Sequence, residues 1–306
     1  MELRHLRYFL AVADELHFGR AAARLGVAQP PLSHQIRQLE RELGFELFVR
    51  TSRRVQLTDA GRAFRDEARA ILARLGDATA AARRVAEGEA GALAVGFVAS
   101  ATYALLPRLY RRFRERHPAV ALTLTELSTA EQVVALRAGQ IQVGLARLPV
   151  GSDAGLAIEP LVEEPLVVAL PTGHPLASAP AVALAALARE PFVLFPRQPR
   201  PGWIDVVQNA CAAAGFRPAV AQEALELSTA VTLVAAGIGV TLVPASAQAL
   251  RLAGVVYRPL EAPAPTTHLL ALHRPDEPRP VVARFLEVAR EVVEAGHGRR
   301  ERTSVR

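Results

Sequence analysis

Two groups of side chains in this 306-residue chain have the types and spacing needed for binding chemistry. The first group lies near the N-terminus and mixes amide, hydroxyl, imidazole and guanidinium groups. Their lengths and hydrogen-bonding capacity suit base edges and phosphates. The candidate contacts are Gln29, Pro30, Pro31, Ser33, His34, Arg37, Arg50, Arg53 and Arg54. The alternative is that they form an ordinary solvated face.

The second group consists of polar residues at the starts of predicted helices in the C-terminal two thirds of the chain. Ser100 precedes one helix, Thr129 begins another, and Trp203 lies where a third opens. If the strands before these helices are parallel, all three starts face one cleft. Their unbonded N–H groups and positive dipole ends would then form an anion site, with an apolar wall from the indole ring.

Two charged residues border the same predicted cleft. Arg147 follows a buried strand at its carboxyl end, and Glu226 precedes a further helix start, so we expect them to pair with each other or to contact a second ligand. The alternative for the hydroxyl residues is that they only cap helices. The complete candidate set is Ser100, Thr129, Arg147, Pro201, Trp203 and Glu226.

The composition excludes several classes of enzyme. All 36 basic residues are Arg, which leaves no lysine amine for a Schiff base, a phosphate loop or a kinase site. The eight His residues are scattered without metal-ligand spacing, and Gly237 and Gly239 lack the third glycine of a dinucleotide fingerprint. We therefore expect no catalysis, no metal and no cofactor. The net charge of +6 is spread along the chain and is weaker evidence for nucleic-acid binding than the placement of the arginines.

The cysteine content and the hydropathy of the sequence indicate the cellular compartment of the protein. The single cysteine, Cys211, cannot form an intramolecular disulfide, which favours a reducing compartment. No apolar run approaches the roughly 18 residues of a membrane span, and the N-terminus lacks the apolar core of an export signal. We expect a cytoplasmic protein without a membrane partner.

The N-terminal candidates require three short helices and a hairpin to position them. Apolar spacing predicts helices over residues 3–13, 18–25 and from Pro30 onward, and Leu32, Ile36, Leu39 and Leu43 place the core on one side of the third helix. The residues around Thr51 to Arg54 are flanked by two short strands. The pattern predicts a helix-turn-helix followed by a basic wing.

A long helix without proline is predicted from Thr58 to Glu87. Apolar residues recur along it at alternating spacings of four and three, as in a heptad seam. They are Phe64, Ala68, Ile71, Leu75, Ala78, Ala82 and Val85. Such a helix is too long for the small N-terminal domain to cover, so we expect the seam to pack on a second copy, the alternative being its own second domain.

Beyond Ala92, strands alternate with helices and predict a parallel sheet covered on both faces. Two proline-containing crossings, near residues 158–170 and 259–265, divide this region into two lobes with a ligand cleft between them. The predicted organisation is a DNA-binding domain over 1–58, a linker helix and hinge over 59–90, and an α/β domain over 91–296. Lobe I comprises about 91–162 and 266–296, lobe II about 163–265, and an Arg-rich tail follows at 297–306.

The chain resembles the LysR-type transcriptional regulators over its whole length. The N-terminal resemblance rests on Ala21-Ala22, Gln29 to Ser33, Leu43-Gly44 and Leu57-Thr58. The C-terminal part is similar to the branch that controls aromatic-ring catabolism in response to muconates and benzoates. The segments that carry this similarity are 96–100, 105–107, 194–203, 233–237 and 244–246. Ala28 stands where the wider family often has Ser, and His34 where a relative commonly has Arg.

This resemblance implies a two-lobed effector domain like that of periplasmic binding proteins. It also implies a homotetramer of two dimers that binds promoter DNA, commonly as an activator, with RNA polymerase as a further partner and a small carboxylate as effector. The alternatives are a regulator of another pathway with a different effector and, from another class, a solute-binding receptor. The receptor is disfavoured because it would need an export signal and would not carry residues 1–58.

Overall fold

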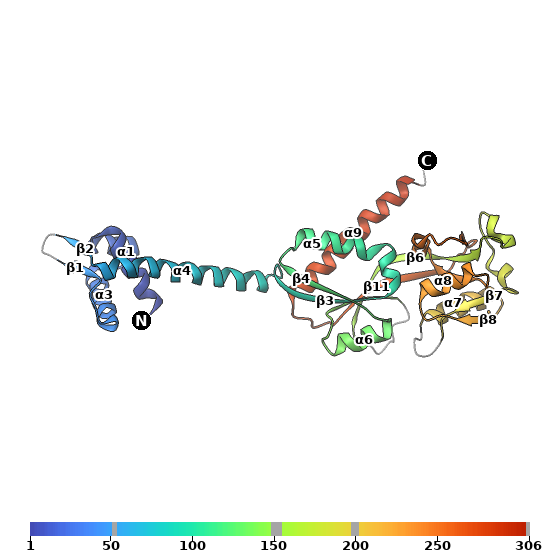
Figure 1. Ribbon diagram of the computed structural model, residues 1–306, viewed down its shortest axis with the longest axis horizontal. Helices are drawn as coiled ribbons and strands as arrows, with labels where there is room; N and C mark the ends of the chain where they lie inside the picture. The colour runs from blue at the N-terminus through green and yellow to red at the C-terminus, as the bar shows by residue number, and fades with distance from the viewer. Residues whose placement is uncertain (51–53, 148–154, 197–201, 304–306) are drawn as a thin grey trace. The chain divides into compact units, whose positions relative to one another are not determined.

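Residues 1–50, 54–147, 155–196 and 202–303 are described by a computed structural model, in which the chain separates into two units, Met1–Arg84 and Val85–Arg306. The first unit contains three short helices, a two-stranded wing and most of a long helix (Figure 1). The second is a two-lobed α/β domain. The predicted fold class is confirmed.

The elements of the first unit follow the predicted order. They are α1 (Leu3–Glu15), α2 (Phe18–Leu25), α3 (Gln29–Leu43), β1 (Phe48–Arg50), β2 (Val55–Leu57) and α4 (Asp59–Ala86). Pro30 and Pro31 lie in the first turn of α3, where a missing N–H breaks no helical hydrogen bond. Gly26 ends α2 at φ +68° and Gly44 ends α3 at φ +82°, a left-handed conformation that favours glycine.

An aromatic cluster holds this unit together. The ring centroid of Phe9 lies 5.5 Å from that of Phe48 and 5.1 Å from that of Phe64. From α3, three fully buried residues complete the core, namely Leu32, Ile36 and Leu39, and Leu43 is half-buried. Because Phe64 belongs to α4, the first turns of the long helix are packed onto the helix-turn-helix.

The sheet of the second unit is mixed, and not parallel throughout as the sequence suggested. Its strands run in the order β10-β6-β11-β5-β3-β4, and β9 also pairs with β6. Only β3 with β4, and β3 with β5, are parallel in this sheet. Its bounds are β3 (Gly91–Phe97), β4 (Val120–Glu126), β5 (Val143–Arg147), β6 (Ala157–Pro171), β9 (Thr241–Pro244), β10 (Val255–Pro259) and β11 (Thr266–His273).

Strands β10 and β11 flank the proline-rich crossing expected near 259–265, and the sequence did not predict either strand. Pro263 and Pro265 lie just outside β11, and Pro259 ends β10, so the prolines bound the strands and do not interrupt them. Strand β11 lies antiparallel between β5 and β6. The crossing between lobes is therefore part of the sheet.

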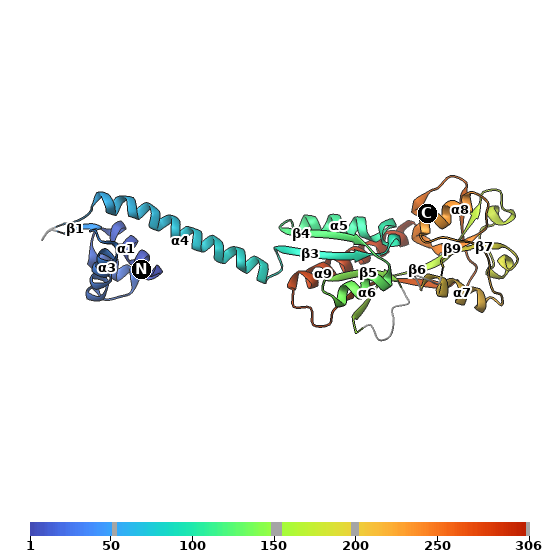
Figure 2. The same cartoon turned by 60° about the horizontal axis from the view of Figure 1, so that its bottom comes forward.

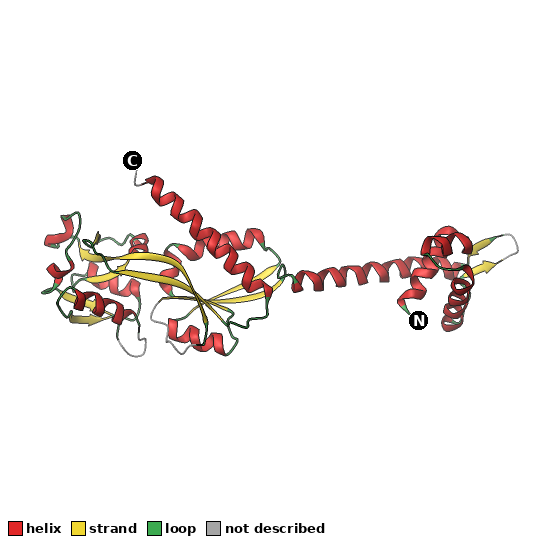
Figure 3. Ribbon diagram, turned by 180° about the vertical axis from the view of Figure 1, so that it is seen from behind, coloured by secondary structure: helices red, strands yellow, loops and turns green. Residues whose placement is uncertain are grey.

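Strand β6 belongs to both lobes. Its first part, to Pro165, pairs with β11, and its last part pairs with β9 and β10. Figure 3 shows the long strands that run from one lobe into the other. In lobe II its alternate residues bury on opposite faces. One face packs into the hydrophobic core that includes α7 (Trp203–Ala213), and the other face packs into the core that includes α8 (Leu227–Ala235). These two helices lie on either side of β9 (Figure 2). A second pair of strands, β7 (Pro191–Leu194) and β8 (Ala219–Glu223), is parallel.

Helices cover both faces of the lobe I sheet. On one face α5 (Leu105–Arg116) packs against α9 (Pro280–Thr303), with the rings of Phe113 and Phe285 5.2 Å apart. The other face is covered by α6 (Thr129–Arg137) through Ala135 and Leu136 (Figure 1).

Among the described residues, three short 3₁₀ helices belong to lobe II and one belongs to lobe I. They are η2 (Pro175–Ser178), η3 (Leu184–Leu187) and η4 (Ala245–Leu250), with η1 (Ala99–Tyr103) preceding α5. The helix expected after Ser100 therefore begins as the 3₁₀ helix η1, which already includes Ser100, and becomes α-helical at Leu105. At the other end, α9 continues to Thr303, beyond Glu294 and into the predicted tail.

Two glycines of α4 provide a matched test of the packing of the first unit. A Cβ on Gly61 would lie 2.1 Å from the carbonyl oxygen of Leu47, whereas one on Gly76 would meet nothing within 4 Å. We expect Gly61→Ala to lower the free energy of unfolding by about 1–3 kcal/mol. Gly76→Ala should raise it by about 0.5–1 kcal/mol through helix propensity. Urea denaturation of both variants measures this, and equal stabilities would contradict the packing described for Gly61.

Candidate functional site

The predicted nucleic-acid contacts of α3 lie outside the core that Leu32, Ile36 and Leu39 form. All are exposed except Ser33, which is half-buried. They are Gln29, Pro30, Pro31, Ser33, His34 and Arg37. The Arg37 side chain reaches back to its own helix, where Nε donates to the carbonyl oxygen of Ser33 at 3.4 Å. Exposed polar side chains are therefore available along the first turns of α3.

Arg50 has a different environment from the other candidates. Its guanidinium pairs with the carboxylate of Glu40 at 2.5 Å and lies 5.2 Å from the centroid of the Phe18 ring. The other oxygen of Glu40 accepts from the backbone N–H groups of Leu47 and Phe48, at 3.0 and 3.2 Å. Arg50 thus helps to fix the wing on α3, and its charge is already balanced.

Sequence reasoning did not assign a role to Glu40. Its signal is the spacing from Ile36, because four residues along a helix return a side chain to the buried face. Of the remaining wing candidates, Arg54 is exposed and Arg53 lies outside the described residues. The role of both in DNA binding stays a prediction.

A pocket lies between the two lobes at the carboxyl ends of their parallel strands. Lobe I contributes the residues that follow β3, β4 and β5, and lobe II those that follow β7 and β8. The cavity measures about 130 Å³. Five of the six predicted effector residues line it, namely Ser100, Thr129, Arg147, Trp203 and Glu226, and Pro201 lies outside the described residues.

Arg147 is the central charged group of this pocket, and only 6% of it is exposed. Its Nη2 donates to the carboxylate of Glu164 at 2.5 Å, and its Nε donates to the hydroxyl of Ser100 at 2.8 Å. The expected pairing of Arg147 with Glu226 is wrong, because Glu164 on β6 is the ion-pair partner. Burial lowers the pKa of the guanidinium, while the Glu164 charge raises it.

The remaining terminal nitrogen of Arg147 has no hydrogen-bond partner. Nη1 is buried, and neither a side chain nor a backbone group within the described ranges accepts from it. A buried donor without an acceptor costs about 1–3 kcal/mol. Arg147 belongs to the pocket lining, so this unsatisfied cationic donor lies in the pocket wall, where an acceptor ligand would be the missing partner.

Glu164 also connects the lobes. Its second oxygen accepts from the backbone N–H of Ser246 at 2.7 Å, at the start of η4 in lobe II. Only 3% of Glu164 is exposed. Sequence reasoning missed this residue because neighbouring Glu163 and Glu164 look alike in the chain, and only the strand register sends one of them inward.

The Thr129 hydroxyl is engaged by the backbone of β5. Its Oγ1 donates to the carbonyl oxygen of Arg147 at 3.0 Å and lies 3.3 Å from the backbone nitrogen of the same residue. The neighbouring Ser128 and Glu131 form a capping box at the start of α6. Thr129 therefore positions the end of β5 against α6, and its freedom to donate to a ligand is smaller than expected.

The lobe II wall is largely apolar. Phe195, Trp203, Leu225 and Leu227 line it, and the indole Nε1 of Trp203 is buried without a partner in the described structure. Carboxylates of Glu126 and Glu226 lie at the pocket lining as well. Together with burial, their charges raise the pKa of the Tyr103 hydroxyl.

Two further findings concern chemistry outside this pocket. Burial raises the pKa of the Cys211 thiol to about 11, so the thiolate needed for nucleophilic chemistry is scarce at neutral pH. Within the described ranges, no three His, Cys, Asp or Glu side chains gather as metal ligands, and no helix is long and apolar enough to cross a bilayer.

The chain matches two families of known proteins. Residues 3–62 match the bacterial regulatory helix-turn-helix proteins of the lysR family, and residues 86–294 match the LysR substrate binding domain. The chain is 42% identical over 290 residues to the HTH-type transcriptional regulator AlsR of Bacillus subtilis (strain 168), which covers 94% of this chain and 95% of that relative. It is also 40% identical over 294 residues to the probable cat1 operon transcriptional activator of Acinetobacter lwoffii, which covers 95% of this chain and 96% of that relative.

Solved structures of the same family share the fold. Full-length CbnR complexed with its target DNA has a TM-score of 0.80 and 33% identity, covering 96% of this chain and 100% of that one. The BenM effector binding domain with its effector benzoate has a TM-score of 0.62 and 31% identity, and the match covers 68% of this chain and 94% of that one.

The Arg147–Glu164 pair predicts a large stability effect. We expect Glu164→Gln to lower the free energy of unfolding by about 3 kcal/mol, because the buried guanidinium loses its counter-charge. The matched control is Glu163→Gln, whose side chain is 60% exposed and should change stability by no more than about 0.5 kcal/mol. Urea denaturation of both variants is the measurement. A Glu164→Gln protein as stable as its control would show that the pair is not required.

Proposed function

Because the chain belongs to the LysR family of transcriptional regulators, we propose that it regulates transcription as a dimer-based assembly whose effector is a small carboxylate of the muconate or benzoate type. The DNA-binding domain is the helix-turn-helix of the first unit. The effector site is the pocket between lobes I and II. The observation that carries the effector proposal is the buried, unpartnered Nη1 of Arg147, a residue of the lining of that pocket.

A carboxylate is the ligand that satisfies this nitrogen best. The Nε and Nη2 groups of Arg147 are already used by Ser100 and Glu164, so one N–H-bearing nitrogen is left for an acceptor. A charged acceptor forms the stronger hydrogen bond with a guanidinium. The first turn of α6, which begins at Thr129 in the pocket lining, adds the positive end of a helix dipole at the same pocket.

The remainder of the ligand is expected to be flat and apolar. The walls from Phe195, Trp203 and Leu227 offer rings and branched side chains to an unsaturated group. The volume of about 130 Å³ is close to the roughly 150 Å³ of an engineered cavity that accepts benzene. The similar BenM domain is described with benzoate as its effector, which supports the same class here.

The effector can act on DNA binding through the arrangement of the lobes. Glu164 joins the Arg147 side chain of lobe I to the Ser246 backbone of lobe II, so a ligand on Arg147 acts at the joint between them. The ligand can shift the equilibrium between two arrangements of the lobes only by the difference between its binding free energies for those arrangements.

The long helix α4 supports dimer formation. Its predicted seam is packed on its own domain only at the start, through Phe64 and Ala68. Farther along, Ile71 is 43% exposed and Val85 is 54% exposed, with Ala78 and Ala82 also exposed between them. A second copy of the same seam would bury these residues and pair two recognition helices on a two-fold DNA site.

The proposal also covers the oligomeric state above the dimer and whether the protein activates or represses transcription. We expect a homotetramer of two dimers that activates a neighbouring operon in contact with RNA polymerase. One relative, 40% identical to this chain, is described as a probable cat1 operon transcriptional activator, which supports activation and the aromatic pathway. The similarity to AlsR supports the alternative of another pathway with a different effector.

A thermal-shift screen followed by calorimetry tests the effector. Muconate, benzoate and chlorobenzoate should raise the melting temperature, and succinate should have little effect. Ser100→Ala should weaken binding about tenfold, because Nε loses its acceptor and the guanidinium its orientation. Thr129→Ala should weaken it less. Ser178→Ala, exposed and remote from the pocket lining, is the control. A response to other acids alone would favour the other pathway, and undiminished affinity in both pocket variants would refute the assigned contacts.

The dimer seam has its own test. Replacing Ile71 with Asp should convert the assembly to smaller species at micromolar concentration, because the charge would be buried in the seam. DNA affinity should fall at least tenfold as the second half-site contact is lost. Ala80→Asp places the same charge on an exposed position of α4 away from the seam and is the control. Sedimentation velocity reports both, and an intact assembly in the Ile71 variant would exclude this seam as the interface.

A further inference from the structure

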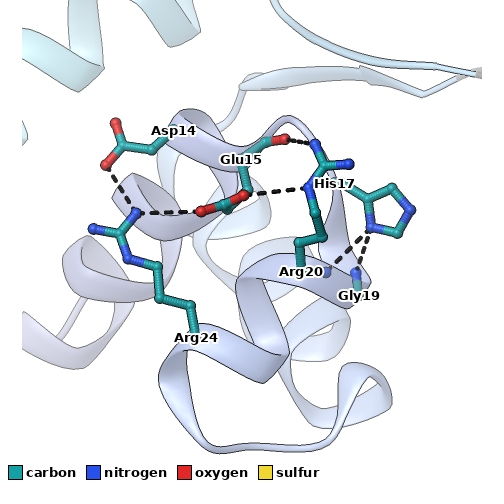
Figure 4. Close-up of polar contacts among 6 residues, drawn as sticks. All are labelled: Asp14, Glu15, His17, Gly19, Arg20 and Arg24. Carbon is teal, nitrogen blue, oxygen red and sulfur yellow. Dashed lines mark hydrogen bonds and ion pairs between the residues drawn. The ribbon is translucent and has the colours of Figure 1, made fainter.

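The N-terminus of α2 is capped by the imidazole ring of His17. The Nδ1 atom of His17 accepts hydrogen bonds from the backbone N–H groups of Gly19 at 3.0 Å and Arg20 at 3.2 Å (Figure 4). Two donors on one ring nitrogen leave no room for a proton there. The neutral ring therefore carries its hydrogen on Nε2.

The Nε2–H group points away from the helix that the ring caps. In Figure 4 this nitrogen lies on the outer side of the ring, away from the two dashed lines. His17 is exposed, and its hydrogen bonds within the described residues both involve Nδ1. A directed, uncharged donor therefore stands at the start of α2.

Neighbouring residues place this donor beside the recognition helix. A Cβ built on Gly19 would lie 3.0 Å from Cε1 of His17 and 3.4 Å from Oε1 of Gln29, so both side chains border the same glycine. Gln29 is the first residue of α3. In a helix-turn-helix the second helix enters the major groove while the first crosses the sugar-phosphate backbone, which brings the α2 start close to phosphates.

Other groups at this end of α2 are already committed. The N–H groups of Gly19 and Arg20 are bonded to His17, so they are not available to a phosphate as bare helix N-termini often are. The guanidinium of Arg20 bonds to the carbonyl and the carboxylate of Glu15, and that of Arg24 pairs with Asp14 and Glu15 (Figure 4).

We infer that His17 is a DNA-contact residue, which caps α2 through Nδ1 and donates Nε2–H to a backbone phosphate beside the base-reading face of α3. The inference rests on the assignment of α3 to DNA. The contact is uncharged, so it adds affinity without releasing a counterion. It should be independent of sequence, unlike a contact from Gln29.

Substitutions that keep the cap separate the two roles of His17. Serine and aspartate are both good N-caps, so His17→Ser and His17→Asp should melt at or above the wild-type temperature. Serine cannot reach a phosphate, and aspartate would repel it. For a duplex selected by the wild-type protein from a random pool, we expect His17→Ser to bind about 3- to 10-fold more weakly with an unchanged salt slope. His17→Asp should lose more than tenfold.

Two controls complete the experiment. His174 caps η2 with the same ring nitrogen, from Leu176 N–H at 3.1 Å, in the effector domain, and His174→Ser should leave DNA affinity unchanged. Gln29→Ala should alter sequence preference. If Gln29→Ala has its effect while His17→Ser binds as wild type, His17 is only a cap and the inference is overturned. A loss confined to His17→Asp overturns it too, because repulsion alone would explain it. If Gln29→Ala and His17→Ser both bind as wild type, the assignment of α3 fails as well.

Discussion

A guanidinium buried at the joint of two lobes is the constraint around which the effector domain is arranged. Arg147 ends β5, and its charge must be matched where water is excluded. Glu164 matches it from β6, the strand shared by both lobes, and its other oxygen holds the Ser246 backbone. One carboxylate thus neutralises the pocket and ties lobe I to lobe II. Since neither partner is stable in this position alone, the register of β6 against β11 has to place Glu164 inward.

The same pair leaves the pocket prepared for a ligand. Ser100 and Glu164 orient the guanidinium from two sides, while Thr129 fixes the backbone of β5 beneath it. The third nitrogen remains unsatisfied in surroundings where hydrogen bonds are strong because water does not screen them. Orientation is therefore provided by the protein before the ligand arrives, which lowers the entropic cost of binding.

In the DNA-binding unit, carboxylates again determine what the arginines can do. Glu40 engages Arg50, Glu15 engages Arg20, and Asp14 accepts from Arg69 of α4 at 2.6 Å. These pairs link the wing to α3, and they link α2 and the long helix α4 to α1. A count of arginines thus overstates the charge available to phosphates, and an uncharged donor such as the His17 ring gains importance at the surface that remains.

Local patterns in the sequence determined the helices of the first unit, the seam of α4 and the class of the second unit. They did so because apolar spacing and helix caps act over a few residues. The carboxyl ends of β3, β4 and β5 also bring Ser100, Thr129 and Arg147 together as the parallel pattern predicts. The tertiary structure alone decided that β11 inserts antiparallel into the sheet and that Glu164, rather than Glu226, meets Arg147. Both depend on pairing between strands about a hundred residues apart, whose register no local spacing encodes.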